Sequence, residues 1–186
     1  MPPYVDTFNQ IMALGTIVLI IMSTIVLLTL LFFRTPANPI LVFFKRHTFI
    51  IAFLIGLGSI AMSLFYSEVI GFTACHMCLI QRVFLYPQAL IFGYLLWRPR
   101  SRQTRPLVET SLIVALFGSL ASSYHLYIEN GGSSSLACAT GGPDVVSCAT
   151  IYVDQWGITI PTMALVASVS IIILLLNYIY MKRKAA

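Results

Sequence analysis

Long apolar stretches separated by short polar segments dominate the chain. Five of these stretches approach or exceed the roughly 20 residues that an α-helix needs to cross a hydrocarbon core about 30 Å thick. They cover residues 11–33, 48–66, 79–97, 107–128 and 158–181. The pattern therefore predicts an all-α integral membrane protein with five transmembrane helices.

The first of these stretches has two interpretations. A cleaved signal sequence begins with positive charge and has a shorter apolar run than a transmembrane helix. Here residues 1–10 contain Asp6 and no Lys or Arg, and the apolar run is long. We therefore expect a retained helix.

Composition agrees with this membrane assignment. Hydrophobic residues make up 59% of the 186 residues and charged residues 9%, whereas soluble domains carry about a quarter charged residues. The net charge of +5 would suit nucleic acid if the basic residues formed a soluble face. They lie instead in short loops and in the tail, so we interpret them as topology signals and expect no nucleic-acid binding.

The basic residues divide the loops into two groups. Residues 34–47 hold three of the 11 Lys and Arg residues, residues 98–106 hold four, and the segment after residue 181 holds three. Residues 67–78 and 129–157 hold none. Because Lys and Arg concentrate in cytoplasmic loops, we expect the C-terminus in the cytoplasm. The N-terminus and the two loops without Lys or Arg should lie outside.

Four cysteines form two pairs on the predicted outer side. Cys75 and Cys78 stand at the start of the third apolar stretch, and Cys138 and Cys148 lie in the long outer loop. The alternative interpretation is that the cysteines are ordinary buried apolar residues, but neither pair lies within an apolar stretch. Disulfides persist outside the cytoplasm, so cysteine placement and charge indicate the same orientation.

The first pair has the spacing of a redox-active Cys-x-x-Cys motif. Unpaired backbone N–H groups at a helix start favour a thiolate, which is the nucleophile in disulfide exchange. A structural disulfide would close too short a loop to add much stability. A zinc site built from Cys75, His76 and Cys78 would need a fourth ligand that the nearby sequence does not offer. Redox chemistry is favoured, and we expect no metal.

The second pair encloses a segment that contains Gly141, Gly142 and Pro143 and follows a Gly- and Ser-rich stretch at 131–135. This composition is typical of a mobile loop. An exposed disulfide on such a loop is open to attack by the thiolate of a partner protein. The alternative is a disulfide that only braces the loop.

Three polar side chains near the predicted outer surface are candidates for binding a cofactor. Arg82 follows Cys78 by one helical turn, where an ionisable residue is costly and usually functional. It would stabilise a thiolate or donate to a quinone carbonyl oxygen, or else anchor the helix at the interface. Gln81 and His125 lie at similar depth and would bind the same ligand; alternatively, Gln81 contacts a neighbouring helix and His125 marks the membrane boundary.

Four short motifs occur together in this chain: Cys-His-Met-Cys-Leu-Ile-Gln-Arg at 75–82, Tyr-Pro at 86–87, Tyr-His at 124–125 and Gly-Ile-Thr-Ile-Pro at 157–161. Together they resemble the bacterial DsbB family of thiol:quinone oxidoreductases, nearest its short-loop, BdbC-like branch. The similarity covers residues 48–181. The chain departs from the family in its extra first helix, in the short spacing of its second cysteine pair, and in the lack of a long amphipathic stretch in the loop that carries this pair.

This resemblance implies a four-helix redox domain over residues 48–186, with extracytoplasmic loops at 67–78 and 129–157. Residues 1–47 would add one N-terminal transmembrane helix and a cytoplasmic loop. The protein would be a multi-pass protein of the bacterial inner (cytoplasmic) membrane that supports disulfide bond formation. We expect it to be a monomer.

The resemblance also implies roles for the cysteines. Cys138 would form a mixed disulfide with an extracytoplasmic thioredoxin-fold, DsbA-like partner, and Cys148 would be its mate. Electrons would then pass to Cys75 and Cys78 and on to a membrane quinone, ubiquinone or menaquinone. Cys78 would form the thiolate or adduct nearest the ring.

The quinone site implied by the resemblance is bordered by Arg82 and His125, with Gln81 as a further candidate contact. All three belong to the predicted outer half of the membrane.

Two other functions compete with this one. Vitamin K epoxide reductase-like enzymes also pair loop cysteines with a membrane Cys-x-x-Cys, but there the motif follows the loop pair, whereas here Cys75 precedes Cys138. The non-enzymatic alternative is a membrane subunit whose disulfides only brace its outer loops.

Overall fold

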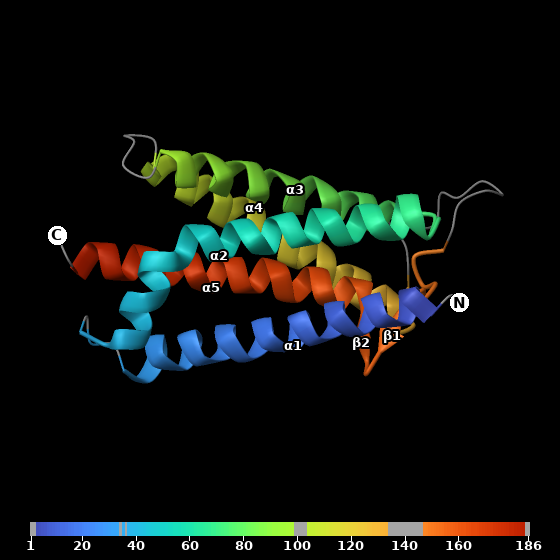
Figure 1. Cartoon of the computed structure of the whole chain (residues 1–186), viewed down its shortest axis with the longest axis horizontal. Coiled ribbons are helices and arrows are strands. Elements are labelled where there is room, and N and C mark those ends of the chain that lie inside the picture. Colours follow the sequence, from blue (N-terminus) through green and yellow to red (C-terminus); the bar gives the residue numbers. More distant parts are fainter. Residues whose placement is uncertain (1–2, 34, 36, 99–103, 134–146, 185–186) are drawn as a thin grey trace.

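Five long helices run side by side in the computed structural model, which describes residues 3–33, 35, 37–98, 104–133 and 147–184 (Figure 1). Each is long and apolar enough to cross a membrane, as the sequence predicted. They are α1 (Pro3–Phe32), α2 (Pro39–Leu64), α3 (His76–Trp97), α4 (Thr104–Glu129) and α5 (Ile160–Lys184). The prediction of an all-α transmembrane bundle is confirmed.

Two helices begin well before the predicted position. α1 starts at Pro3 and not at residue 11, and α2 starts at Pro39 and not at residue 48. Hydropathy marks the part of a helix that fits the hydrocarbon core, whereas the helix itself continues to its cap. For α2 that cap is Asn38, whose side chain accepts a hydrogen bond from the Ile40 N–H at 3.0 Å, with proline at the first helical position.

The central element of the bundle is α5. It packs against α1, α2 and α4 and, less extensively, against α3 (Figure 1). Small side chains such as Ala164, Ala167 and Ser168 are buried along it and let neighbouring backbones approach closely. The main core cluster joins α5 through Ile171 and Leu175 to buried residues of α2, α3 and α4.

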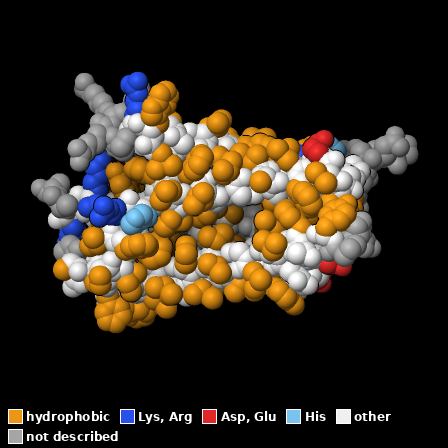
Figure 2. Space-filling view, viewed as in Figure 1, with side chains coloured by type: hydrophobic (Ala, Val, Ile, Leu, Met, Phe, Trp, Pro, Cys, Tyr) orange, Lys and Arg blue, Asp and Glu red, His pale blue; other side chains and the backbone are white. Residues whose placement is uncertain are grey.

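Side-chain types are segregated along the long axis. Figure 2 shows apolar side chains over most of the length, Lys and Arg at the end where the C-terminus lies, and Asp and Glu toward the opposite end. An apolar girdle with charge confined to the two ends is the pattern that a bilayer requires. The described parts of the α2–α3 and α4–α5 connections, with Cys75 and Cys148, lie at the acidic end (Figure 1).

Two short elements at this end had not been predicted. A π-helix, η1 (Phe65–Val69), extends α2, and a hairpin of β1 (Asp154–Gln155) and β2 (Ile158–Thr159) precedes α5. The hairpin turn has positive φ at Trp156 (56°) and Gly157 (76°), as a two-residue turn of this hand requires. Pro161 lies in the first turn of α5, where its missing N–H costs no hydrogen bond.

Candidate active site

The Cys-x-x-Cys motif forms the first turn of α3. Cys75 is the N-cap residue, in an extended conformation, and its sulfur accepts a hydrogen bond from the Cys78 N–H at 3.3 Å. The two Sγ atoms are 2.9 Å apart, and both cysteines are free. The helix start thus holds two thiols within reach of each other and directs a backbone donor at one of them.

Hydrogen bonds make Cys75 the more acidic thiol of the pair. Either thiol can donate in the contact between the two sulfurs, but two further donors, from His125 and the Cys78 backbone, already point at the Cys75 sulfur. The hydrogen bond with the Cys78 side chain, supported by these two, lowers the pKa of Cys75 from 9.0 to about 4, although burial acts in the opposite direction. In the reduced pair Cys75 is therefore the thiol that ionises first, with the Cys78 thiol donating to it, whereas the resemblance assigned the thiolate to Cys78.

His125 of α4 connects this pair with the loop after residue 146. Its Nδ1 lies 3.2 Å from the amide nitrogen of Gln81. Since the amide nitrogen donates, Nε2 carries the ring proton, and it lies 3.7 Å from the Cys75 sulfur and 3.2 Å from the Cys148 carbonyl oxygen. The ring is only 4% exposed. One imidazole thus donates toward both the thiolate and the loop.

Cys148 lies at the same end of the molecule. It is 2% exposed, is disulfide-bonded, and packs in a cluster with Cys75, Met77 and Ile128. Cys138 lies outside the described residues. Three of the four predicted cysteines therefore come together around the start of α3.

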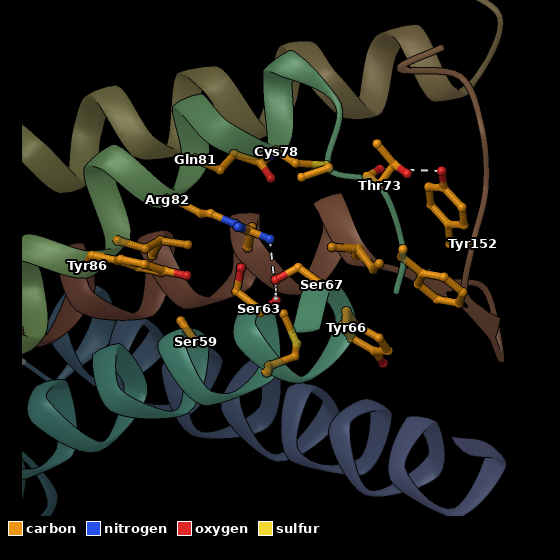
Figure 3. A pocket seen from close by; sticks show the side chains of 16 residues that line it. Ser59, Ser63, Tyr66, Ser67, Thr73, Cys78, Gln81, Arg82, Tyr86 and Tyr152 are labelled. Carbon is orange, nitrogen blue, oxygen red and sulfur yellow. Dashed lines mark hydrogen bonds between the residues drawn. The ribbon is translucent and has the colours of Figure 1, made fainter. Parts of the chain in front are cut away.

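A cavity of about 60 Å³ opens on the other side of Cys78, between α2, α3 and α5. We call it the Arg82 cavity; α3 contributes Cys78, Gln81 and Arg82 to its lining, and Figure 3 shows the Arg82 side chain extending into it. The Nη2 of Arg82 donates to the Ser63 carbonyl oxygen at 3.4 Å, while its buried Nε has no hydrogen-bond partner among the described residues. The guanidinium therefore keeps donors for a ligand.

Arg82 and His125 do not face the same space. Arg82 lines the Arg82 cavity, whereas His125 lines a smaller cavity of about 20 Å³ together with Cys75. Neighbouring helical residues diverge by about 100°, so Gln81 turns toward α4 and Arg82 toward α2. The two cavities meet at Cys78, Tyr152 and Ile160, which line both of them. That Arg82 and His125 border one ligand site therefore stays a prediction.

Aromatic side chains that the sequence had not singled out for this purpose form the outer wall of the Arg82 cavity. Tyr66 stacks on Phe72 with ring centroids 5.8 Å apart, and Phe72 stacks on Tyr152 at 4.6 Å. Tyr152 also donates to the Thr73 carbonyl oxygen at 3.4 Å (Figure 3). Nothing in the sequence spacing of Tyr152 indicates a cavity.

The thiols also belong to a possible metal-binding group. Ligand atoms of Cys75, Cys78 and His125 lie within 4.8 Å of one another. This set differs from the one considered from sequence, since His125 replaces His76. Structural zinc takes four ligands, and the group found among the described residues supplies three. The sulfur contact of 2.9 Å instead suits the formation of a disulfide.

Comparison with known proteins agrees with this chemistry. The family model described as "Disulfide bond formation protein DsbB" matches residues 45–178. Disulfide bond formation protein C of Bacillus subtilis (strain 168) is 32% identical over 134 residues, which are 70% of this chain and 88% of that protein. No solved structure shows a significant match.

Two further relatives carry similar names. The probable disulfide formation protein of Oceanobacillus iheyensis is 36% identical over 119 residues, 62% of this chain and 77% of that protein. Probable disulfide formation protein C 1 of Bacillus anthracis is 32% identical over 123 residues, 66% of this chain and 83% of that protein. These matches confirm the resemblance inferred from the motifs and favour it over the vitamin K epoxide reductase-like alternative. With five membrane-spanning helices and a Cys-x-x-Cys pair at the start of α3, the chain belongs to the DsbB family of disulfide bond formation proteins and is a multi-pass membrane disulfide oxidoreductase.

Proposed function

We propose that the protein re-oxidises the dithiol of an extracytoplasmic thioredoxin-fold, DsbA-like partner and transfers the electrons to a membrane quinone. The observation that carries this proposal is the position of the Cys-x-x-Cys pair between two different surroundings. Cys75 faces His125 and the loop of Cys148, whereas Cys78 lines both the small cavity beside His125 and the Arg82 cavity. One side suits exchange with a protein, and the other suits a small membrane-soluble oxidant.

The proposed orientation places the acidic end outside. Basic residues gather at the C-terminal end of the molecule, and Lys and Arg favour the cytoplasmic face (Figure 2). The cysteines would then lie in the compartment where disulfides persist. In this arrangement residues 48–186 form the redox domain of a bacterial inner-membrane protein, and residues 1–47 form an added helix and a cytoplasmic loop.

The first exchange would involve the loop pair. A partner thiolate attacks Cys138, which gives a mixed disulfide and releases Cys148 as a thiolate. The partner's second thiol, once deprotonated, attacks the partner's first sulfur in the mixed disulfide and releases Cys138 as a thiolate. The partner leaves oxidised, and the loop pair has taken up two electrons. A loop thiolate then attacks the Cys75–Cys78 disulfide in the same way. Each step breaks one S–S bond and forms another.

The reduced Cys75–Cys78 pair would next return its two electrons to the oxidant. Its geometry suits this, because the Cys75 thiolate already lies 2.9 Å from the Cys78 sulfur with which it must form a bond. A quinone bound in the Arg82 cavity would accept two electrons and two protons and leave as the quinol. Ubiquinone and menaquinone both present ring carbonyl oxygens that suit the unused donors of Arg82.

The remaining candidate residues would position these groups. Arg82 and Gln81 line the cavity and would hold a ring oxygen. His125 is assigned to the exchange side, where its Nε2–H holds the Cys148 carbonyl beside the Cys75 thiolate. The direct quinone contact that the resemblance implied for His125 stays a prediction beside this role.

A trapping experiment tests the partner side. A purified DsbA-class protein whose second active-site thiol is replaced by serine is mixed with the oxidised protein. Because that partner cannot resolve a mixed disulfide, we expect a covalent complex through Cys138 that is absent in the Cys138→Ser variant. If no complex forms with the intact loop pair, the partner proposal is wrong.

The quinone side is tested by turnover. Purified protein supplied with the reduced wild-type partner should bleach quinone absorbance, and Cys78→Ser should abolish this. A Cys78→Ser variant that still reduces quinone at the wild-type rate would exclude the proposed route of the electrons.

A further inference from the structure

The helix that lies outside the family match also contacts the candidate active site. The match begins at residue 45, after α1 has ended. Asn9 of α1 accepts a buried hydrogen bond of 2.7 Å from the hydroxyl of Tyr66, a wall residue of the Arg82 cavity. Phe8 packs on Phe65 with ring centroids 3.9 Å apart. The added helix is therefore attached to the wall of this cavity.

A second and larger cavity lies along α1. It has a volume of about 480 Å³ and is lined by α1 residues within 11–22, by α2 residues within 51–62, and by Met163 and Ala167 of α5. We call it the α1 groove. In the space-filling view the apolar face is hollowed between α1 and α2 (Figure 2).

The lining of the α1 groove is apolar in effect. Among the described residues, none of those that line it is charged. The hydroxyls of Thr16 and Ser59 donate back to the carbonyl oxygens of Met12 and Ile55, each at 2.9 Å, so neither is left for a polar ligand. The groove therefore suits a hydrocarbon chain and not a headgroup.

The two cavities share part of their lining. Ser59 and Met62 line both the Arg82 cavity and the α1 groove. From Met62 to Ile51 the groove follows α2 for about 16 Å, roughly half the thickness of the hydrocarbon core. The α1 groove thus runs from the Arg82 cavity toward the middle of the bilayer.

We propose that the α1 groove binds the polyprenyl tail of the quinone, so that α1 supplies a tail-binding subsite to the enzyme. This inference rests on the proposed function. The Arg82 cavity of about 60 Å³ has space on the order of five waters, comparable to a compact ring and too little for a long chain. The tail of a quinone whose ring lies in the Arg82 cavity must extend past apolar side chains, and Ser59 and Met62 link the linings of the Arg82 cavity and the α1 groove.

Gly15 and Gly58 allow the groove to be filled from two sides. A Cβ at either position meets nothing within 4 Å, so Gly15→Leu on α1 and Gly58→Leu on α2 place new atoms in open space and not against backbone. Val18→Phe is the matched control, because Val18 lies on the same helix, is 54% exposed and does not line the groove. Two variants on different helices guard against a folding defect in either one.

The test compares a quinone carrying a full polyprenyl tail with the same ring lacking the tail. The bilayer is as apolar as the groove, so binding there gains mainly packing contacts and the effect is moderate. We expect Gly15→Leu and Gly58→Leu to raise the apparent KM of the tailed quinone about fivefold. The tail-less quinone should be unaffected in both variants, and Val18→Phe should change neither.

A second readout does not depend on turnover. A quinone with a photoreactive diazirine in its tail should label α1 peptides that contain Met12 and Met22, and Gly15→Leu should reduce this labelling. Equal effects on the tailed and tail-less quinones, or labelling confined to other helices, would overturn the inference and leave the groove to bilayer lipid. A wild-type protein that reduces neither quinone would instead overturn the proposed function.

Discussion

Three hydrogen-bond donors converge on the sulfur of Cys75: the Cys78 thiol, the Cys78 backbone N–H and the His125 imidazole. Each favours the charged form of an otherwise buried group, and together they outweigh desolvation. The sequence could indicate the helix-start contribution, because Cys-x-x-Cys motifs commonly cap a helix. It could not indicate His125, which comes from another helix.

The lowered pKa of Cys75 predicts a pH dependence. In the reduced protein, the ultraviolet absorbance of the Cys75 thiolate should persist down to about pH 4. The Cys75→Ser variant, as the control, should lack this absorbance. Since the folded pKa lies below the unfolded value, the associated stabilisation is complete above about pH 9 and is lost as pH falls toward 4. His125→Ala should move the transition upward. A transition near pH 9 in the wild type would contradict the assignment.

Arg82 predicts a separate effect on quinone affinity. Removing a charge-assisted hydrogen bond costs roughly 1.5–3 kcal/mol, so Arg82→Ala should raise the apparent KM for quinone about 10- to 100-fold. The rate of disulfide exchange with the partner should stay near that of the wild type. Arg82→Lys keeps the charge but not the forked donors, so its apparent KM for quinone should lie between those of the wild type and Arg82→Ala. An unchanged KM in Arg82→Ala would exclude this contact.

At the scale of secondary structure elements, hydropathy predicted all five helices but not all of their ends. The early start of α2 was marked in the sequence by Asn38-Pro39, a cap signal that a hydropathy pattern ignores. The π-helix at Phe65–Val69 has no comparable signal. Its residues contact Phe8 and Asn9, which are distant in sequence.

The attachment of α1 predicts a stability effect. Asn9→Ala leaves the buried hydroxyl of Tyr66 without its acceptor, which should lower the free energy of unfolding by about 1–3 kcal/mol. Asn9→Asp keeps an acceptor oxygen and should lose less. Thermal unfolding in detergent measures both, and an Asn9→Ala protein as stable as the wild type would show that the bond contributes nothing.

Packing between α2 and α3 predicts a contrast between two glycines on one helix. A Cβ at Gly56 would lie 2.9 Å from the backbone nitrogen of Ala89, whereas one at Gly58 meets nothing within 4 Å. Gly56→Ala should therefore destabilise the protein by about 1–3 kcal/mol. Gly58→Ala should be neutral or stabilising by up to about 1 kcal/mol, because alanine favours helix. Similar unfolding midpoints for the two variants would refute the close approach.

At the scale of the whole molecule, charge separation predicts membrane orientation. Asn130 and Lys184 are exposed at opposite ends of the bundle. In intact cells, a membrane-impermeant thiol reagent should label Asn130→Cys, whereas Lys184→Cys should react only after the membrane is permeabilised. The reverse pattern would invert the topology.

The separation of Arg82 from His125 shows what sequence spacing could not provide. Both residues were placed at the same depth, and depth follows from position along a span. The direction in which each side chain points depends on how α3 packs between α2 and α4, which is a property of the assembled bundle. The cysteines were easier to predict, because the start of α3 and the outer loops share one end of the molecule.

The start of α3 has Cys75 beside the loop of Cys148, and Cys78 beside both that site and the Arg82 cavity. Under the proposed function, a water-soluble partner and a membrane-soluble quinone would therefore reach the same helical turn from two directions. When one of the two substrates is scarce, the Cys75–Cys78 pair would stay in the redox state produced by its reaction with the other substrate.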